Sequence, residues 1–266
     1  MYDTILLRYG EIFLKGKNKK VFENKLVRNI KAISGVNEVK LLRARLVVDY
    51  FSELVLLRRV LGLVSYSPAV KVEKDLDVIC KKAVSLLKGK KGKFKVVTKR
   101  SDKRFPLESP EINVEVGKFI ESSLKDLEFS FKDPDYILNL EINQDGAYLF
   151  TDVFPCFGGL PVGVEGKVTL LYEGFESVVA GWLMMKRGVG LDIFAVKKLT
   201  EEDLEILQKF SPKKITVLGK LSGNSLVSGQ SFNNLKDYGF SGGIFRPLIA
   251  FSSEEILGRY EGIKRV

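Results

Sequence analysis

The chain has 266 residues, with 43 Lys or Arg, 33 Asp or Glu and no His, so its formal net charge is +10. This length suits two or three small domains, and an apolar fraction of 45% is typical of a globular protein. The absence of histidine excludes Ser–His and Cys–His nucleophiles and the commonest metal ligand. Any chemistry must therefore use carboxylates, lysines, backbone dipoles or a bound metal.

The two cysteines, Cys80 and Cys156, are too few for a zinc site and too far apart for a C-x-x-C redox pair. Low cysteine usage and a start without a signal peptide predict a cytoplasmic location. No segment approaches 18 apolar residues, and the basic helices lack the apolar face of an interfacial anchor. We therefore expect no metal and no membrane partner.

The positive charge is concentrated in the first part of the chain. Residues 1–106 hold 26 Lys and Arg against 10 Asp and Glu, whereas residues 107–266 hold 17 against 23. This asymmetry indicates a polyanion-binding region joined to a region of another kind, and nucleic acid is the polyanion that best fits it.

The elements of the first 65 residues are predicted in the order strand, helix, two strands, helix. Asn18 is a plausible N-cap after the turn at residues 15–18, and apolar residues at helical spacing follow it. This order predicts a ferredoxin-like domain over residues 1–65. The predicted elements are a strand at 4–8, a helix at 19–33, strands within 36–50 and a helix at 52–61.

A second domain is predicted over residues 66–155. Its hairpin is marked by Asn143-Gln144-Asp145-Gly146 between two apolar runs, and its helices by apolar periodicity. The predicted elements are a helix at 75–87, a strand at 94–99, a helix at 111–124, and hairpin strands at 136–142 and 147–154.

The basic turn that precedes the second of these helices is the most informative motif in the chain. It combines four cations and a ring with the start of a helix, where Ser109 can cap, Pro110 fits the first position and Glu111 complements the dipole. Such a turn suits a phosphate chain with an unstacked base, and a solvated basic loop is the open alternative. The cations and ring are Lys99, Arg100, Lys103, Arg104 and Phe105.

Residues 156–166 are rich in glycine and predict a linker. Strands and helices then alternate over residues 167–266, which predicts a parallel sheet with crossover helices. The predicted elements are strands at 168–172, 191–196 and 215–218 and helices at 177–187 and 200–210.

Several motifs together resemble the tRNA 4-thiouridine synthase (tRNA sulfurtransferase) family over nearly the whole chain. They are Arg8-Tyr9-Gly10-Glu11, Leu14-Lys15-Gly16-Lys17-Asn18, Lys103-Arg104-Phe105-Pro106, Gly158–Gly163 with Gly166-Lys167, Ala180–Gly188 and Arg246-Pro247-Leu248-Ile249. The resemblance implies an α/β protein with an α+β front half. It consists of a ferredoxin-like domain, a THUMP domain and a reduced Rossmann-like PP-loop domain of the ATP-pyrophosphatase type. In this family the front half docks tRNA, and the back half adenylates a uridine before sulfur replaces the activated oxygen.

The chain departs from the family at the PP-loop, which normally reads Ser-Gly-Gly-x-Asp-Ser. Here the segment is Tyr172-Glu173-Gly174-Phe175-Glu176-Ser177, so only Gly174 and Ser177 match. Glu173 would repel phosphates, Tyr172 would crowd a position that takes a small serine, and Glu176 replaces an aspartate. The loop is then a plain strand-to-helix turn, unless Glu173 and Glu176 hold Mg²⁺ that carries the phosphates.

Two functions follow from this comparison, and a third leaves RNA aside. The first is a tRNA-binding protein of tRNA modification whose own ATP site is inactive. The second is an active ATP- and Mg²⁺-dependent sulfurtransferase with an external sulfur donor, whose candidate nucleotide and catalytic residues are Gly174, Glu176 and Ser177. The third is a protein-assembly module. The expected RNA contacts are Arg8, Tyr9, Lys15, Lys17, Lys99, Arg100, Lys103, Arg104 and Phe105.

The expected partners are tRNA, a catalytic partner or sulfur carrier, and a second copy of the chain. Cys156 precedes the nucleotide domain and so matches no catalytic cysteine of the family, and Cys80 is expected to be a buried hydrophobe.

Overall fold

The computed structural model describes residues 2–221, 223 and 225–266, which fold into two compact units. The first unit comprises Met1–Leu7, Lys40–Tyr50 and Tyr66–Phe154, and the second comprises Arg8–Val39, Phe51–Ser65 and Pro155–Val266. The chain passes between the two units near residues 65 and 155. Within residues 1–65, most strand residues cluster with the first unit and the helical residues with the second.

One mixed sheet organises the first unit. Its order is β2-β3-β1-β4-β8-β7-β5-β6, with β9 beside β4. The predicted hairpin is confirmed, since β7 and β8 pair antiparallel around Asn143 and Gly146. The strands are β1 (Thr4–Tyr9), β2 (Lys40–Leu42), β3 (Arg45–Asp49), β4 (Leu63–Val72), β5 (Gly92–Arg100), β6 (Leu127–Phe129), β7 (Tyr136–Asn143), β8 (Gly146–Phe150) and β9 (Phe154–Pro155).

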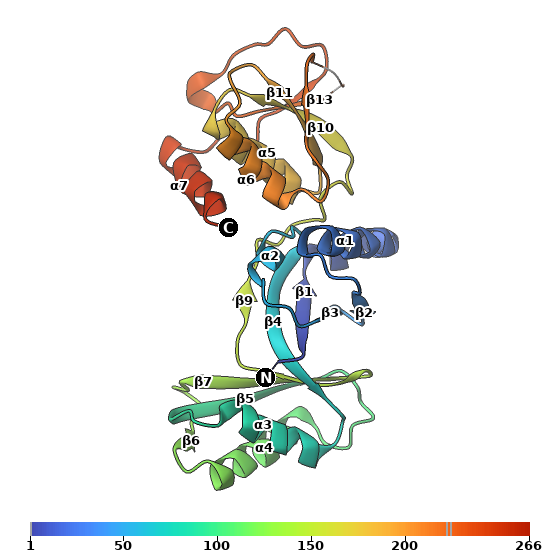
Figure 1. The fold of residues 1–266 in the computed structure, drawn as a ribbon, viewed down its shortest axis with the longest axis vertical. Helices are drawn as coiled ribbons and strands as arrows, with labels where there is room; N and C mark the ends of the chain where they lie inside the picture. The colour runs from blue at the N-terminus through green and yellow to red at the C-terminus, as the bar shows by residue number, and fades with distance from the viewer. Residues whose placement is uncertain (1, 222, 224) are drawn as a thin grey trace. The chain divides into compact units, whose positions relative to one another are not determined.

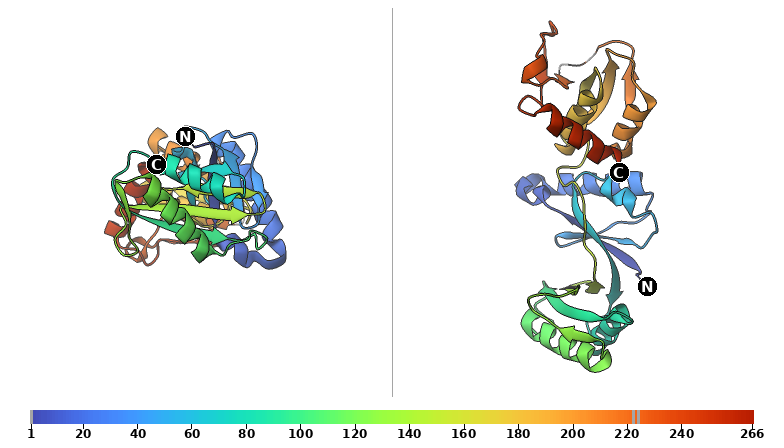
Figure 2. Two further views of the ribbon diagram at one scale, coloured as in Figure 1. Left: turned by 90° about the horizontal axis from the view of Figure 1, so that it is seen from below. Right: turned by 90° about the vertical axis from the view of Figure 1, so that its left-hand side faces the viewer.

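Two helices, α3 (Leu76–Leu87) and α4 (Ser109–Ser123), lie side by side on one face of this sheet (Figures 1 and 2). Both helices were predicted. The N-cap of α4 is Glu108, however, and not Ser109. The Glu108 N–H donates to the Glu111 carboxylate at 2.7 Å, and the Glu108 side chain accepts in return from the Glu111 N–H. This capping box satisfies two orphan donors, which a serine cap alone would not.

The second unit begins with η1 (Glu11–Asn18), α1 (Lys19–Ser34) and α2 (Val55–Arg58). Residues 11–18 form a 3₁₀ helix with a non-helical kink at Gly16, where a turn was predicted. Asn18 is the N-cap residue of α1, as predicted, but its side chain makes no capping bond. The helix predicted at 52–61 shortens to four residues, because the chain turns at Gly62, with φ +109°, to enter β4.

The C-terminal part of the second unit is the predicted parallel sheet. Every neighbouring pair in the order β12-β11-β10-β13-β14 is parallel. Helix α5 packs against both α6 and α7, and the three bury one core with β10, β11 and β13 (Figure 1). The elements are β10 (Lys167–Tyr172), α5 (Phe175–Lys186), β11 (Gly190–Ala195), α6 (Glu201–Phe210), β12 (Thr216–Leu218), β13 (Ser225–Ser228), η2 (Phe232–Asn234), β14 (Gly243–Phe245) and α7 (Ser253–Lys264).

The segment predicted as a linker is packed within the second unit. Gly158 N–H donates to the carbonyl of Leu63 at 2.8 Å, and Leu160 N–H donates to that of Lys186 at 2.9 Å. The Asn29 side chain donates to the carbonyl of Val162 at 3.1 Å. Residues 156–166 are therefore a hydrogen-bonded connection to α1, β4 and α5, because their glycines allow backbones to approach closely.

Gly159 is the glycine of this connection that can least accept a side chain. It has φ +82°, and a Cβ there would lie 2.3 Å from the carbonyl oxygen of Lys186. We expect Gly159→Ala to lower the free energy of unfolding by about 2–4 kcal/mol, from the left-handed backbone and the clash together. Denaturant unfolding followed by circular dichroism measures this.

Gly166→Ala is the matched control, because Gly166 has φ +91° but a Cβ added to it would meet nothing within 4 Å. Its cost should be only the backbone cost of about 1–2 kcal/mol. Equal losses in the two variants would contradict the predicted clash.

Candidate functional site

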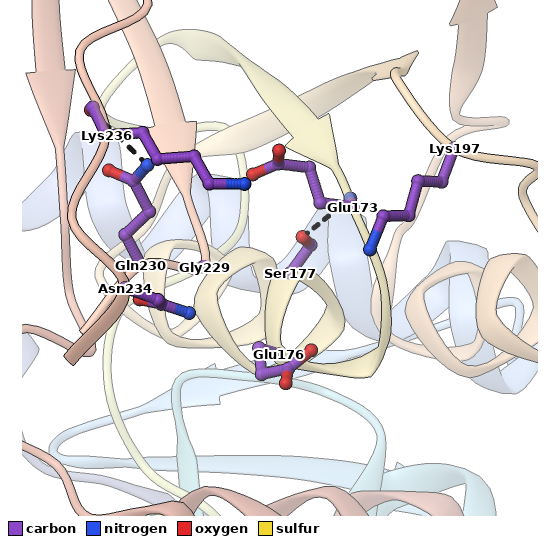
Figure 3. A pocket seen from close by; sticks show the side chains of 8 residues that line it. All are labelled: Glu173, Glu176, Ser177, Lys197, Gly229, Gln230, Asn234 and Lys236. Carbon is purple, nitrogen blue, oxygen red and sulfur yellow. Dashed lines mark hydrogen bonds between the residues drawn. The ribbon is translucent and has the colours of Figure 1, made fainter.

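A pocket lies at the carboxyl ends of β10 and β13. In the order β12-β11-β10-β13-β14, the chain proceeds from β10 to one edge of the sheet and from β13 to the other, so these neighbours form a topological switch point. Open parallel sheets bind ligands at such points. Figure 3 shows the lining residues, which are Glu173, Glu176, Ser177, Lys197, Gly229, Gln230, Asn234 and Lys236.

Close packing between a strand end and a helix start forms the floor of this pocket. Gly229 follows β13, and a Cβ on it would lie 2.7 Å from the Ser177 nitrogen in the first turn of α5. Ser177 Oγ accepts from the Glu173 N–H at 3.0 Å and so closes the turn, and Gly174 has φ +148°. The structure therefore brings the predicted residues Gly174, Glu176 and Ser177 together at one helix start.

Tyr172 lies outside the pocket, so the prediction that its ring crowds the loop is wrong. It is the last residue of β10, and its side chain is 3% exposed. Its hydroxyl donates to the Asp203 carboxylate at 2.5 Å, and Tyr260 donates to the other oxygen of Asp203 at 2.7 Å. Strand alternation explains this, because successive side chains of β10 point to opposite faces of the sheet.

Glu173 is the first residue after β10, and it brings a carboxylate to the pocket. The Tyr238 hydroxyl donates to this carboxylate and lies 3.1 Å from Ser228 Oγ. Burial, together with the bond to Glu173, raises the pKa of Tyr238 to about 12, so it stays a neutral donor at physiological pH. Lys197 and Lys236 line the same pocket, and their positive charges partly balance Glu173 and Glu176.

Lys197, Asn234 and Lys236 line the pocket but were not predicted to do so from the sequence. Lys197 comes just after β11, and Asn234 and Lys236 belong to the segment that follows β13. The available signal was positional, since residues just after parallel strands meet at one edge of a sheet. To use that signal, β13 must first be predicted from the sequence. This is difficult because its four residues show little hydrophobic periodicity.

Two of the expected RNA contacts have buried rings. Phe105 is 5% exposed and belongs to the core under α3 and α4. Tyr9 is 3% exposed, bonds the Glu23 carboxylate through its hydroxyl at 2.5 Å and stacks on Phe13. Tyr9 and Phe105 are therefore packed in the protein core, where neither ring presents a face to solvent on which a base could stack.

The cations of the basic turn have different roles in the first unit. The Arg100 guanidinium donates to the carbonyls of Phe105 at 2.9 Å and Lys103 at 3.3 Å, so it fixes the turn. Lys99 and Lys103 are exposed.

Arg104 is bonded within the turn but remains accessible. Its guanidinium donates to the Asp102 carboxylate at 2.9 Å, yet its side chain stays 74% exposed. Hydrogen bonds from Arg104 and Lys74 hold the pKa of the Asp102 carboxyl well below its usual range. Asp102 therefore stays ionised at neutral pH and offsets part of the positive charge of this turn.

The other expected cations belong to the second unit. Lys15 forms an ion pair with Glu165 at 3.2 Å, and Lys17 is exposed. Arg8 is half-buried near the end of β1. The expected RNA contacts therefore fall on two separate units.

The first unit also contains a basic hollow of about 360 Å³ that was not predicted from the sequence. It lies where the turn between β2 and β3 meets the ends of β5 and β7, and Arg43, Arg45 and Lys99 contribute its positive charge. Arg45 is paired with Glu141 at 2.9 Å. Arg43 and Lys99 have no ion pair within the described residues. In the sequence, the feature that points to this hollow is Arg43-Ala44-Arg45, a basic turn between two short strands. The proximity of this turn to Lys99 arises only from the tertiary fold, so the sequence does not reveal it.

Lys99 and Arg100, the two cations at the end of β5, should contribute differently to the free energy of unfolding. We expect Arg100→Ala to lower the free energy of unfolding by about 1–3 kcal/mol, because two carbonyls lose a charged donor. Lys99→Ala should change it by less than about 0.5 kcal/mol, since its side chain is exposed. Denaturant unfolding of both variants tests this, and a larger loss in Lys99→Ala would contradict the assignment.

Comparison with known proteins gives two domain matches. A THUMP domain model matches residues 73–152, and a ThiI ferredoxin-like domain model matches residues 4–67.

Within the described residues, no helix is both long and apolar enough to cross a membrane.

Curated relatives extend the similarity into the C-terminal half. A protein of Thermoanaerobacter pseudethanolicus named "Probable tRNA sulfurtransferase" is 34% identical over 321 residues, which cover 97% of this chain and 84% of that protein. Since this chain has only 266 residues, at least 55 aligned positions of that relative have no counterpart here. A Brevibacillus brevis protein of the same name is 41% identical over 203 residues, or 72% of this chain and about half (51%) of that protein.

The fold also matches a solved structure described as a 4-thiouridine synthetase–RNA complex with bound ATP. The TM-score is 0.83 at 26% identity, with 99% of this chain and 85% of that chain covered.

Proposed function

The chain belongs to the tRNA sulfurtransferase family, and we propose that it binds tRNA in tRNA modification while its own nucleotide pocket does not carry out ATP-dependent chemistry. The observation that carries the proposal is the Glu173 carboxylate at the end of β10, held in the pocket by Tyr238. The chemical step would then depend on a catalytic partner or a sulfur carrier.

The RNA-binding part rests on exposed cations in regions that match RNA-associated domains. Lys99 and Arg43 border the hollow in the first unit without ion pairs among the described residues, and Lys103 is exposed nearby in sequence. Phosphate contacts of this kind supply most of the affinity of nucleic-acid binding. The matched solved structure is itself an RNA complex, which supports the same assignment.

The residues of the pocket do not fit a triphosphate. A PP-loop binds phosphates through backbone N–H groups at a helix start, and the Glu173 N–H is already bonded to Ser177 Oγ. The carboxylates of Glu173 and Glu176 add negative charge to the same pocket, and like charges at close range repel. The cavity measures about 110 Å³, below the roughly 300–1,000 Å³ of usual small-molecule sites.

Magnesium could offset this repulsion only with sufficient ligands. Within the described residues, no group of three or more His, Cys, Asp or Glu side chains is arranged to hold a metal ion. Glu173 also already accepts the Tyr238 hydroxyl. We therefore derive no step through ATP or Mg²⁺ for this chain.

The cysteines support dependence on an outside sulfur source. Burial raises the pKa of Cys156 to about 12 and that of Cys80 to about 11. Thiolates are the reactive form of cysteine, and both thiols are protonated at neutral pH. Cys156 lies near the carbonyl of Leu57 at 3.7 Å, outside the pocket lining.

The RNA contacts can be tested through salt dependence. We expect the double variant Arg43→Ala, Lys99→Ala to bind tRNA more weakly and to flatten the plot of log affinity against log salt by about 1.4–1.8, since each phosphate contact contributes about 0.7–0.9. Lys118→Ala with Lys125→Ala removes the same charge from another exposed surface and should leave the slope unchanged. An unaltered slope in the first variant would exclude the hollow as a phosphate site.

The inactive pocket can be tested by calorimetric titration of ATP with Mg²⁺, with and without tRNA. The wild-type protein should give no binding heat, whereas Glu173→Gly, which removes the charge and restores a glycine, should give a measurable heat of ATP binding. A thermal melt confirms that the variant is folded. Micromolar binding by the wild-type protein that is lost in Glu176→Ala would instead favour an active ATP-dependent sulfurtransferase.

A further inference from the structure

The turn that precedes α1 presents apolar side chains to solvent. Leu14 is 85% exposed, Val21 is 60% exposed and Phe13 is 41% exposed. Phe13 and Leu14 lie in η1, just before its kink at Gly16, and Val21 lies in the first turn of α1. Single exposed apolar residues are normal, but a cluster of this kind around one turn indicates a contact surface.

The tip that carries Leu14 is held in one conformation by its neighbours. Ile12 is fully buried, and the Phe13 N–H donates to the carbonyl of Gly10 at 3.0 Å. The Phe13 ring stacks on Tyr9, with ring centroids 4.7 Å apart. Gly16, with φ +51°, then turns the chain toward α1. Leu14 is therefore exposed on a pre-organised turn, and binding through it requires little ordering.

Lysines follow this apolar tip in the sequence, and Lys19 lies over the Phe13 ring. Residues 11–20 contain four lysines and a single acidic residue, Glu11. Glu11 is paired with Arg187 at 3.3 Å, and Lys15 with Glu165 at 3.2 Å. Lys17 and Lys20 are exposed and have no ion pair within the described residues. An apolar side chain among free cations is complementary to a ligand with phosphates around a flat apolar face.

We propose that Leu14 packs against the terminal base pair of an RNA helix while Lys17 and Lys20 contact the adjacent phosphates. A base pair at a helix end exposes one apolar face, and leucine is among the side chains that proteins insert against base steps. This inference rests on the proposed RNA-binding function and assigns a position on the RNA to one turn of the protein. It does not involve the hollow of the first unit or the pocket after β10.

A membrane surface is the competing ligand for an apolar turn with lysines. Interfacial binding normally needs a broad apolar helix face. The apolar stripe of α1 is instead buried, since Phe22, Leu26 and Ile30 are at most 6% exposed. One leucine and a few neighbours give too small an apolar area for a membrane anchor, so the observations favour RNA.

The test compares two RNAs that share one stem. One is a hairpin with a blunt open end that carries 2-aminopurine in its last base pair, and the other is closed by loops at both ends. The full-length wild-type protein should bind the open-ended RNA about fivefold or more tightly and should change the 2-aminopurine fluorescence. Leu14→Ser should lose the preference and the fluorescence change but keep its affinity for the closed RNA.

Leu257→Ser is the matched control, because Leu257 is 51% exposed on α7. It should behave as the wild type. Equal wild-type affinity for the two RNAs, or a preference that survives Leu14→Ser, would overturn the inference while leaving RNA binding intact. Absence of RNA binding would instead contradict the proposed function itself. Leu14-dependent binding to phosphatidylserine vesicles without an RNA-end preference would assign the turn to a membrane.

Discussion

Glu173 places a carboxylate where β10 passes into α5, and the contacts of the pocket are arranged around that carboxylate. Gly174, Ser177 and Gly229 keep the close strand-to-helix geometry of an anion-binding turn. The carboxylate adds negative charge at that turn, beside Lys197 and Lys236. It also receives the Tyr238 hydroxyl, and so ties the segment after β13 to the end of β10. The pocket is thus organised around a protein carboxylate, and a bound phosphate would have to replace these bonds in a setting that repels it.

The connection between β12 and β13 is short for two strands that are not neighbours in the sheet. These strands are parallel members of the sheet and are separated by β11 and β10, yet only residues 219–224 join them. A parallel crossover normally takes a dozen or more residues and includes a helix. At least 55 aligned positions of the Thermoanaerobacter relative have no counterpart in this chain. The helices α5, α6 and α7 share one core, whereas parallel sheets usually carry helices on both faces.

Local signals predicted the regular elements well and the site only in part. Asp75 and Thr200 cap their helices through their side chains, and the Asn143–Gly146 turn joins the predicted hairpin. These features depend on neighbours in the sequence. The roles of Arg100 and Phe105 could not be predicted in the same way. A basic turn with an aromatic residue has the same composition whether its side chains contact RNA or pack against the protein's own backbone and core. Here Arg100 bonds two carbonyls and Phe105 is buried. The proximity of Arg43 to Lys99, and of Lys236 to Glu173, depends on sheet order, which no local pattern encodes.

Recognition of RNA and activation of a nucleotide both require positive potential, but at different places in the chain. RNA phosphates require accessible cations, and Arg43, Lys99 and Lys17 are exposed without competing ion pairs among the described residues. Nucleotide activation requires a cationic or N–H-lined pocket and a reactive nucleophile. The pocket after β10 instead contains two carboxylates beside two lysines, and both cysteines have raised pKa values. The two sets of features are independent, because exposed cations on short turns place few demands on the packing of the C-terminal parallel sheet.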